Sequence, residues 1–95
     1  MEQEKPRIVD NPSELRYEAW AGDTLAGLIR YTLDGDVLTM VHTEVEPAFE
    51  GEGLGSKLVS GALDDVRAQG KRIRPLCPFV AAHVRGHPEY RDLVA

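Results

Sequence analysis

A glycine-rich stretch between a β-type run and a helical pattern constrains the fold of this chain most strongly. The stretch runs from Val45 to Ser56 and has glycines at alternate positions, 51, 53 and 55. Residues 37–45 before it are apolar and β-rich, and residues 56–69 after it have apolar side chains at a helical period. Glycines allow a tight turn and close approach of a ligand, and a helix start offers unpaired N–H groups with partial positive charge. Strand, glycine loop and helix together indicate a phosphate-binding turn.

The spacing of the glycines excludes two familiar phosphate loops. No Gly-Lys-Ser/Thr follows, so this is not the loop of nucleoside triphosphatases. The alternate glycines also fit the dinucleotide-binding pattern poorly, and the preceding run is not a first strand near the N-terminus. By itself, the stretch is equally consistent with a simple turn between a strand and a helix.

Length and charge narrow the class of protein. The 95 residues predict a single domain over residues 1–95, with residues 1–6 frayed. A net charge of −5 argues against nucleic acid or an anionic membrane as the main partner, because both need a clustered basic face. The one basic cluster in the sequence, residues 71–74, is short and is interpreted as a solvated strand entrance or as a phosphate contact.

Cysteine usage and hydropathy indicate the compartment. Cys77 is the single cysteine, so no internal disulfide forms and a reducing compartment is expected. The N-terminus has no apolar core of a signal peptide, and no apolar run approaches the ~20 residues of a membrane span. The chain is therefore predicted to be cytoplasmic, with no membrane association.

Periodicity predicts an α+β fold. An antiparallel meander of strands over residues 8–10, 15–20, 24–33 and 37–45 precedes a helix over 56–69 that ends at Gly70. A strand over 72–76 and a helix that starts at Cys77-Pro78 follow. The meander and the β-α-β-α unit imply parallel pairing of strands 37–45 and 72–76. Trp20 and Phe79 are expected in the core.

At this point the residues resemble a known family. The frame Glu50-Gly51-Glu52-Gly53-Leu54-Gly55, with the order of elements around it, is similar to the pyrophosphate motif of the Gcn5-related N-acetyltransferase (GNAT) fold. The segments 42–45 (HTEV), 76–80 (LCPFV) and 87–90 (HPEY) resemble the small branch of that superfamily, over roughly residues 7–94. That branch is a minimal GNAT-like fold with a splayed parallel strand pair, and it lacks the N-terminal helices that shape the acceptor site in larger members.

The resemblance implies a coenzyme site for acetyl-CoA. It implies that the loop binds the pyrophosphate through main-chain N–H groups, and that the backbone of Val45 meets the pantetheine or thioester where the strands splay. The implied binding residues are Val45, Glu50, Gly51, Glu52, Gly53, Leu54, Gly55 and Ser56. The family has Arg or Gln at the position of Glu50, so we expect a reduced or unchanged affinity rather than a lost site.

Three side chains are candidates for the chemistry of acetyl transfer, which needs a neutral amine and a proton for the leaving thiolate. Strand alternation places Glu44 and His42 on one face with Leu38 and Met40, where either could deprotonate an ammonium. The alternatives are an exposed carboxylate that pairs with a lysine or arginine, for Glu44, and a hydrogen-bonded, half-buried histidine, for His42. Cys77 at a helix N-terminus is predicted to be a transient acetyl acceptor, a general acid or a small buried hydrophobe.

These observations predict an acetyl-CoA-dependent N-acetyltransferase that acts on a small-molecule or peptide amine. The alternatives are a non-catalytic domain that binds the coenzyme or a protein, and an acyl transferase that works through Cys77. His83 and His87 lie four residues apart but have no evident third ligand, so no metal is expected. The chain is expected to be a monomer or a homodimer.

Overall fold

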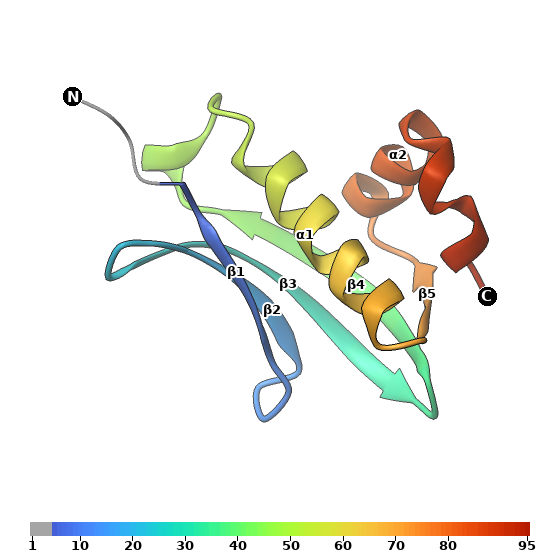
Figure 1. Ribbon diagram of the computed structural model, residues 1–95. Helices are drawn as coiled ribbons and strands as arrows, with labels where there is room; N and C mark the ends of the chain where they lie inside the picture. The colour runs from blue at the N-terminus through green and yellow to red at the C-terminus, as the bar shows by residue number, and fades with distance from the viewer. Residues whose placement is uncertain (1–4) are drawn as a thin grey trace.

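The computed structural model describes residues 5–95 of the chain (Figure 1). The predicted fraying of residues 1–6 falls mainly on residues 1–4, which lie outside the described part, and residues 5 and 6 precede the first strand without regular structure. The elements are β1 (Arg7–Asn11), β2 (Arg16–Ala21), β3 (Thr24–Asp34), β4 (Val37–Val45), the 3-10 helix η1 (Pro47–Phe49), α1 (Leu54–Ala68), β5 (Arg72–Pro75), α2 (Pro78–Gly86) and the 3-10 helix η2 (Pro88–Leu93).

The five strands form one mixed sheet in the order β1-β2-β3-β4-β5. Neighbouring strands from β1 to β4 are antiparallel to each other. β5 pairs with β4 in parallel, from Val37 opposite Arg72 to Met40 opposite Pro75. Figure 1 shows α1 lying along one face of this sheet, with α2 beside it on the same side. The predicted α+β class and the predicted parallel pair are confirmed.

The core lies between α1 and the sheet. The apolar positions of α1 recur every three or four residues, and this stripe is buried, as its helical period requires. The sheet contributes alternate residues of β2, β3 and β4, since successive strand side chains point to opposite faces. The fully buried side chains include Tyr17, Ile29, Met40, Leu58, Val59, Leu63, Val66 and Ile73. Gly70 then ends the helix in the left-handed conformation (φ 70°) that favours glycine.

A bulge interrupts the pairing of β4 with β3. Arg30 lies opposite His42, but the next residue of β3, Tyr31, lies opposite Met40. Val41 is therefore one extra residue on β4, and its side chain is exposed. Because side chains alternate along a strand, one inserted residue exchanges the two faces for every residue that follows it.

This exchange overturns one of the predictions from the sequence. Leu38 and Met40 point into the core, as expected, but beyond the bulge it is Thr43 that points to the side of the helices. His42 and Glu44 are exposed on the opposite face of the sheet. The prediction that His42 and Glu44 share a face with Leu38 and Met40 is therefore wrong.

A cluster of polar rings joins α1, α2 and η2. The ring of His83 is buried, and its Nε2 lies 2.9 Å from the hydroxyl of Ser60 on α1. The His83 and His87 rings stack with centroids 3.9 Å apart, and the hydroxyl of Tyr90 donates to Asp64 over 2.8 Å. Burial and the neighbouring His87 lower the pKa of His83, although Glu89 acts weakly in the opposite direction.

The first prediction concerns Gly27, which lies opposite both Ala19 and Val45. A Cβ at this position would lie 2.9 Å from the carbonyl oxygen of Glu44. We expect Gly27→Ala to reduce the free energy of unfolding in urea by about 1–3 kcal/mol, because a backbone atom cannot move aside cheaply. Gly86→Ala is the matched control, since its Cβ would meet nothing within 4 Å. Equal stabilities of the two variants would contradict this account.

The second prediction concerns the pH dependence of stability. The lowered pKa of His83 means that the folded state binds this proton less readily than the unfolded state, whose histidine pKa is about 6.5. The free energy of unfolding should therefore fall as the pH is lowered from about 7.5 to about 5.5. His83→Gln should flatten this slope. A slope unchanged in His83→Gln would show that other groups cause the effect.

Candidate active site

The parallel pair opens where β5 ends. The last hydrogen bond between the main chains of the two segments is that of the N–H of Cys77, which donates to the carbonyl of Met40 over 2.9 Å. β4 continues to Val45, but β5 stops at Pro75. Within residues 5–95, the end of β4 thus has no strand partner on that side. The result is a wedge between β4 and the start of α2, with Cys77 at its apex.

Hydrogen bonds surround the sulfur of Cys77. Its Sγ lies 3.3 Å from the hydroxyl of Thr43, and main-chain groups of Val80, Phe79 and Thr43 also bond to it. Burial by itself raises the pKa of the Cys77 thiol, but these hydrogen bonds outweigh burial and lower the pKa below its usual value. The thiol is buried, which agrees with the prediction of a small buried residue, and its lowered pKa also makes it easier to ionise.

Thr43 is the site residue that sequence reasoning missed. Strict alternation along β4 assigned Thr43 to the face of the sheet away from Met40. Only the bulge turns its hydroxyl toward Cys77. The one signal in the sequence was that Thr43 is polar and lies between the candidates His42 and Glu44. This signal did not distinguish Thr43 from these two neighbours. The side of β4 that faces Cys77 is therefore the Thr43 side.

His42 and Glu44 lie away from the wedge. Their side chains pair with each other, His42 Nε2 to Glu44 Oε2 at 3.2 Å, and each is more than half exposed. The alternative interpretation of Glu44 as an exposed carboxylate agrees with its position, but its partner is His42 rather than a lysine or arginine. The structure does not bring either side chain together with Cys77.

The glycine loop has the backbone that its sequence predicts. Gly51 and Gly53 have φ values of 82° and 76°, in the left-handed region that favours glycine, and a Cβ on either would meet nothing within 4 Å. Gly53 is the N-cap of α1, and no side chain caps this helix start. The first N–H groups of α1 are therefore available to an anion.

Gly55 has a different role from the other two glycines. It lies in the first turn of α1, and a Cβ there would come within 2.7 Å of the Phe79 ring. Phe79 was expected in the core, but its side chain is 44% exposed and covers the start of α1. Gly55 therefore makes room for Phe79, which was not foreseen from the sequence.

A cavity of about 350 Å³ lies between the loop and α2. It is lined by Val45, Phe49, Glu50, Gly51, Gly53, Leu54, Gly55, Ser56 and Phe79. Seven of the eight coenzyme-binding residues inferred from the resemblance thus surround one space, and Glu52 does not. The structure adds the two aromatic side chains, Phe49 and Phe79, to this set.

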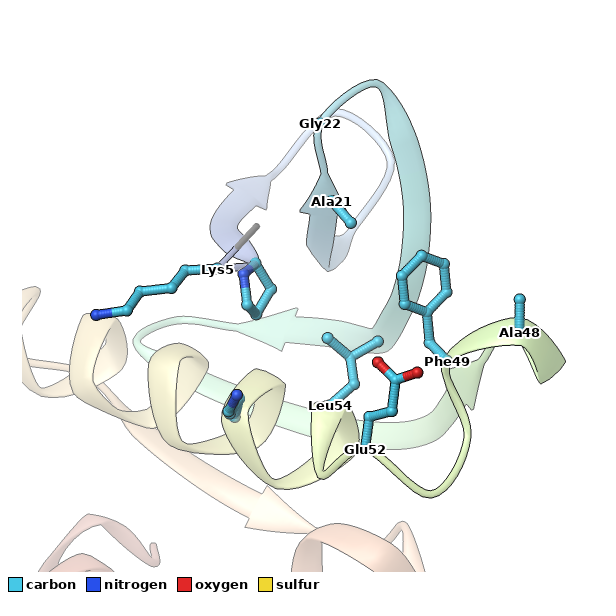
Figure 2. Close-up of a pocket in the computed structure, with 9 residues that line it drawn as sticks. Lys5, Ala21, Gly22, Ala48, Phe49, Glu52 and Leu54 are labelled. Atoms are coloured by element: carbon cyan, nitrogen blue, oxygen red, sulfur yellow. The ribbon is translucent and has the colours of Figure 1, made fainter. Parts of the chain in front are cut away.

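A larger cavity of about 560 Å³ lies on the other side of Phe49 and Leu54 (Figure 2). Its walls are Lys5, Pro6, Ala21, Gly22, Ala48, Phe49, Glu52, Leu54 and Lys57. Figure 2 shows Phe49, Leu54 and Glu52 on one side of this space and Ala21, at the end of β2, on the other. The lining includes neither Cys77 nor Thr43, so this cavity is separate from the wedge.

Neither a metal site nor a membrane-spanning helix is found within residues 5–95. No group of three or more His, Cys, Asp or Glu side chains is arranged to hold a metal ion in this part of the chain. No helix in it has the length and apolar character needed to cross a membrane.

Comparison with known proteins gives the family. A family model described as GCN5-related N-acetyl-transferase matches residues 16–93. The chain therefore belongs to the GCN5-related N-acetyltransferase family. No match was found among curated proteins.

Solved structures share the fold. A GCN5-like candidate N-acetyltransferase from Staphylococcus aureus has a TM-score of 0.70 at 21% identity, over 94% of this chain and 87% of its own. The ribosomal-protein-S18-alanine N-acetyltransferase from Escherichia coli has a TM-score of 0.62 at 17% identity, over 81% of this chain and 53% of its own. A Bacillus subtilis acetyltransferase in complex with CoA has a TM-score of 0.53 at 20% identity, over 73% of this chain and 62% of its own. The present chain thus spans about half of the E. coli enzyme.

The third prediction tests the hydrogen bond between Thr43 and Cys77. Thr43→Val keeps the shape of the side chain and removes the hydroxyl, so the pKa of the Cys77 thiol should rise. Alkylation by iodoacetamide at pH 7 should then slow several-fold, and its pH profile should move to higher pH. Thr39→Val, on the same strand, is the control. An unchanged profile in Thr43→Val would mean that the main-chain groups alone set the acidity of the thiol.

Proposed function

We propose that the chain binds acetyl-CoA in the cavity between the glycine loop and Phe79 and transfers the acetyl group to an amine. The observation that carries this proposal is the combination of an uncapped helix start with a hydrogen-bonded thiol, in a member of a family of N-acetyltransferases. The two features are neighbours through Phe79, which lines the cavity at the helix start and bonds to the sulfur of Cys77 through its main chain, although Cys77 and Thr43 are not part of the cavity lining.

The residues present fit the coenzyme. The left-handed conformations of Gly51 and Gly53 turn the chain just before the free N–H groups of α1, which suit a pyrophosphate. Glu50 is exposed beside this loop and adds a negative charge, so it should weaken the binding of a pyrophosphate without removing the backbone donors. Gly55 contributes by accommodating Phe79, and the ring must lie against the coenzyme or move aside for it.

The free edge of β4 would guide the pantetheine arm. Beyond Met40 the main-chain groups on this edge have no strand partner in residues 5–95, so an extended amide-containing chain can pair with Val45 as a strand would. The thioester would then lie in the wedge, near Thr43 and Cys77. Acetyl-CoA supplies the activated acetyl group, and the chain supplies its position.

Cys77 would act in one of two ways, as a nucleophile or as an acid. As a nucleophile, its thiolate attacks the acetyl carbonyl carbon, forms a Cys77 thioester and releases the coenzyme thiolate, and the acceptor amine then takes the acetyl group, loses a proton and frees the thiol. As an acid, its S–H protonates the coenzyme thiolate when the amine attacks directly. The lowered pKa of Cys77 favours the nucleophilic path.

The acceptor would be a cationic amine that approaches an acidic surface. Exposed glutamates gather after β4 and in the loop, at positions 46, 50 and 52. Such a rim attracts an ammonium group, whether on a small molecule or on a peptide. The name of the E. coli neighbour assigns it a ribosomal protein as acceptor, which is consistent with a peptide amine here.

A second function is a coenzyme-binding domain without turnover. The observation that favours it is the position of His42 and Glu44, which the sequence predicted as bases and which face away from Cys77. Their catalytic roles stay predictions from the sequence. Turnover with a panel of amines separates this second function from the first.

The fourth prediction tests the coenzyme site by calorimetric titration with acetyl-CoA. The wild-type chain should bind saturably, and Gly53→Val should not bind, because a β-branched residue is strained at this φ and would shift the backbone of the loop. Gly35→Val places the same strain in the hairpin between β3 and β4, so it controls for stability. Normal binding by Gly53→Val would show that the loop is not the coenzyme site.

Intact mass after incubation with acetyl-CoA, without an amine, completes this test. The nucleophilic path predicts an added acetyl group on the wild-type chain and none on Cys77→Ala. Binding without an adduct, followed by turnover with an amine, would leave Cys77 the role of acid.

A further inference from the structure

The face of the sheet opposite α1 carries most of the arginines of the protein. The register of the strands shows which arginines lie on this face, because residues directly opposite each other on neighbouring strands point to the same face. Arg16 lies opposite Arg30, and Arg30 lies opposite the exposed His42. Five of the eight arginines in the sequence lie on this arginine face, namely Arg7, Arg16, Arg30, Arg72 and Arg74.

The arginine face has the opposite sign of charge from the whole chain. The net charge of the protein is −5. On the face, five arginines stand against three carboxylates, those of Glu18, Asp34 and Glu44. Glu18 is bonded to Arg16, and Glu44 is paired with His42. Of the five arginines, only Arg16 makes an ion pair within residues 5–95.

This arrangement opposes folding stability. Arg16 and Arg30 are direct cross-strand neighbours, and like charges in that position destabilise a sheet. No helix of residues 5–95 covers this face, and Figure 1 shows α1 and α2 together on the other side. An unfavourable cluster of one sign on an uncovered face is typical of a surface that meets an oppositely charged partner.

The buried carboxylate of Glu18 holds part of the arginine face in place before any partner binds. Glu18 is 4% exposed, although it lies on the face without helices. It accepts hydrogen bonds from Asn11 at 2.9 Å, from Arg16 Nε at 2.6 Å and from Trp20 Nε1 at 3.0 Å. These bonds hold Arg16 and Trp20 in place, while within the described residues the two terminal nitrogens of Arg16 make no hydrogen bond. Fixed side chains lose less entropy when a partner binds.

We propose that the arginine face docks an acidic helix of a partner protein. Guanidinium groups bind carboxylates in a bidentate manner, which suits Arg16 and Arg30 in one row across the sheet. From β2 to β5 the arginines span three strand spacings, roughly 14 Å, and carboxylates two turns apart on a helix span roughly 11 Å. A nucleic acid is a poorer occupant, because its dense charge is repelled by the acidic remainder of the molecule.

The docking surface and the wedge are the two sides of β4. His42 and Glu44 border the arginine face, while Thr43 points to Cys77. A partner on the arginine face would therefore be held one strand thickness from the thiol without closing the wedge. The docking proposal does not depend on acetyl transfer.

The fifth prediction tests docking with a fluorescently labelled poly-L-glutamate peptide, followed by anisotropy at an ionic strength of roughly 50 mM, where screening is weak. The emission of Trp20, the single tryptophan of the chain, reports whether the peptide lies on this face. We expect saturable binding, which Arg30→Glu combined with Arg74→Glu weakens by about tenfold or more. Arg85→Glu combined with Arg91→Glu changes the net charge equally at exposed positions elsewhere, and should weaken binding less than about twofold.

Three results would overturn the proposal. Equal weakening by the two double variants would mean that only the net charge matters. Absence of saturable binding by the wild-type chain would remove the docking surface. Tighter binding of single-stranded polyuridylate than of poly-L-glutamate, with the same dependence on Arg30 and Arg74, would assign the arginine face to nucleic acid. Circular dichroism of each variant shows that its fold is retained.

Discussion

The pairing of β4 with β3 contains one extra residue, Val41, and the geometry of the site depends on it. Without this bulge, His42 and Glu44 would point toward the helices and Thr43 would point away from Cys77. With it, a hydroxyl meets the thiol and the two ionisable side chains lie on the outer face. Bulges occur often beside active sites because they turn side chains at little cost to the rest of the sheet.

The opening of the sheet and the acidity of the thiol have a common cause. Because β5 ends at Pro75, Cys77 starts α2 at the apex of the wedge, and the freed main chain at Thr43 joins the first amides of α2 around the sulfur. A buried thiol without these donors would stay protonated, since burial raises its pKa. Buried position and low pKa are therefore compatible here, so the predicted roles of Cys77 as a buried residue and as a reactive one are not exclusive.

Local patterns predicted the elements well, and contacts between distant segments limited the prediction of the site. The apolar period over 56–69 gave a helix that runs from Leu54 to Ala68, and the strand-helix-strand order gave the parallel pair. The bulge depends on the register between β3 and β4, which no local pattern contains. The reason for Gly55 is the ring of Phe79, a residue 24 positions later, so its alternate spacing with Gly53 was misleading.

The net charge of the chain likewise does not show how the charged residues are distributed over its surface. The value of −5 argued against nucleic acid or an anionic membrane as the main partner, and the glutamates around the loop favour a cationic acceptor. Strand alternation nevertheless gathers five arginines on the other face, where Glu18 orders Arg16. The loop after β4 is thus acidic while the arginine face is basic, so a macromolecule can be attracted to the arginine face while an ammonium group is attracted to the loop. If both proposals hold, a protein acceptor would need an acidic docking helix and a basic, flexible segment that carries the amine.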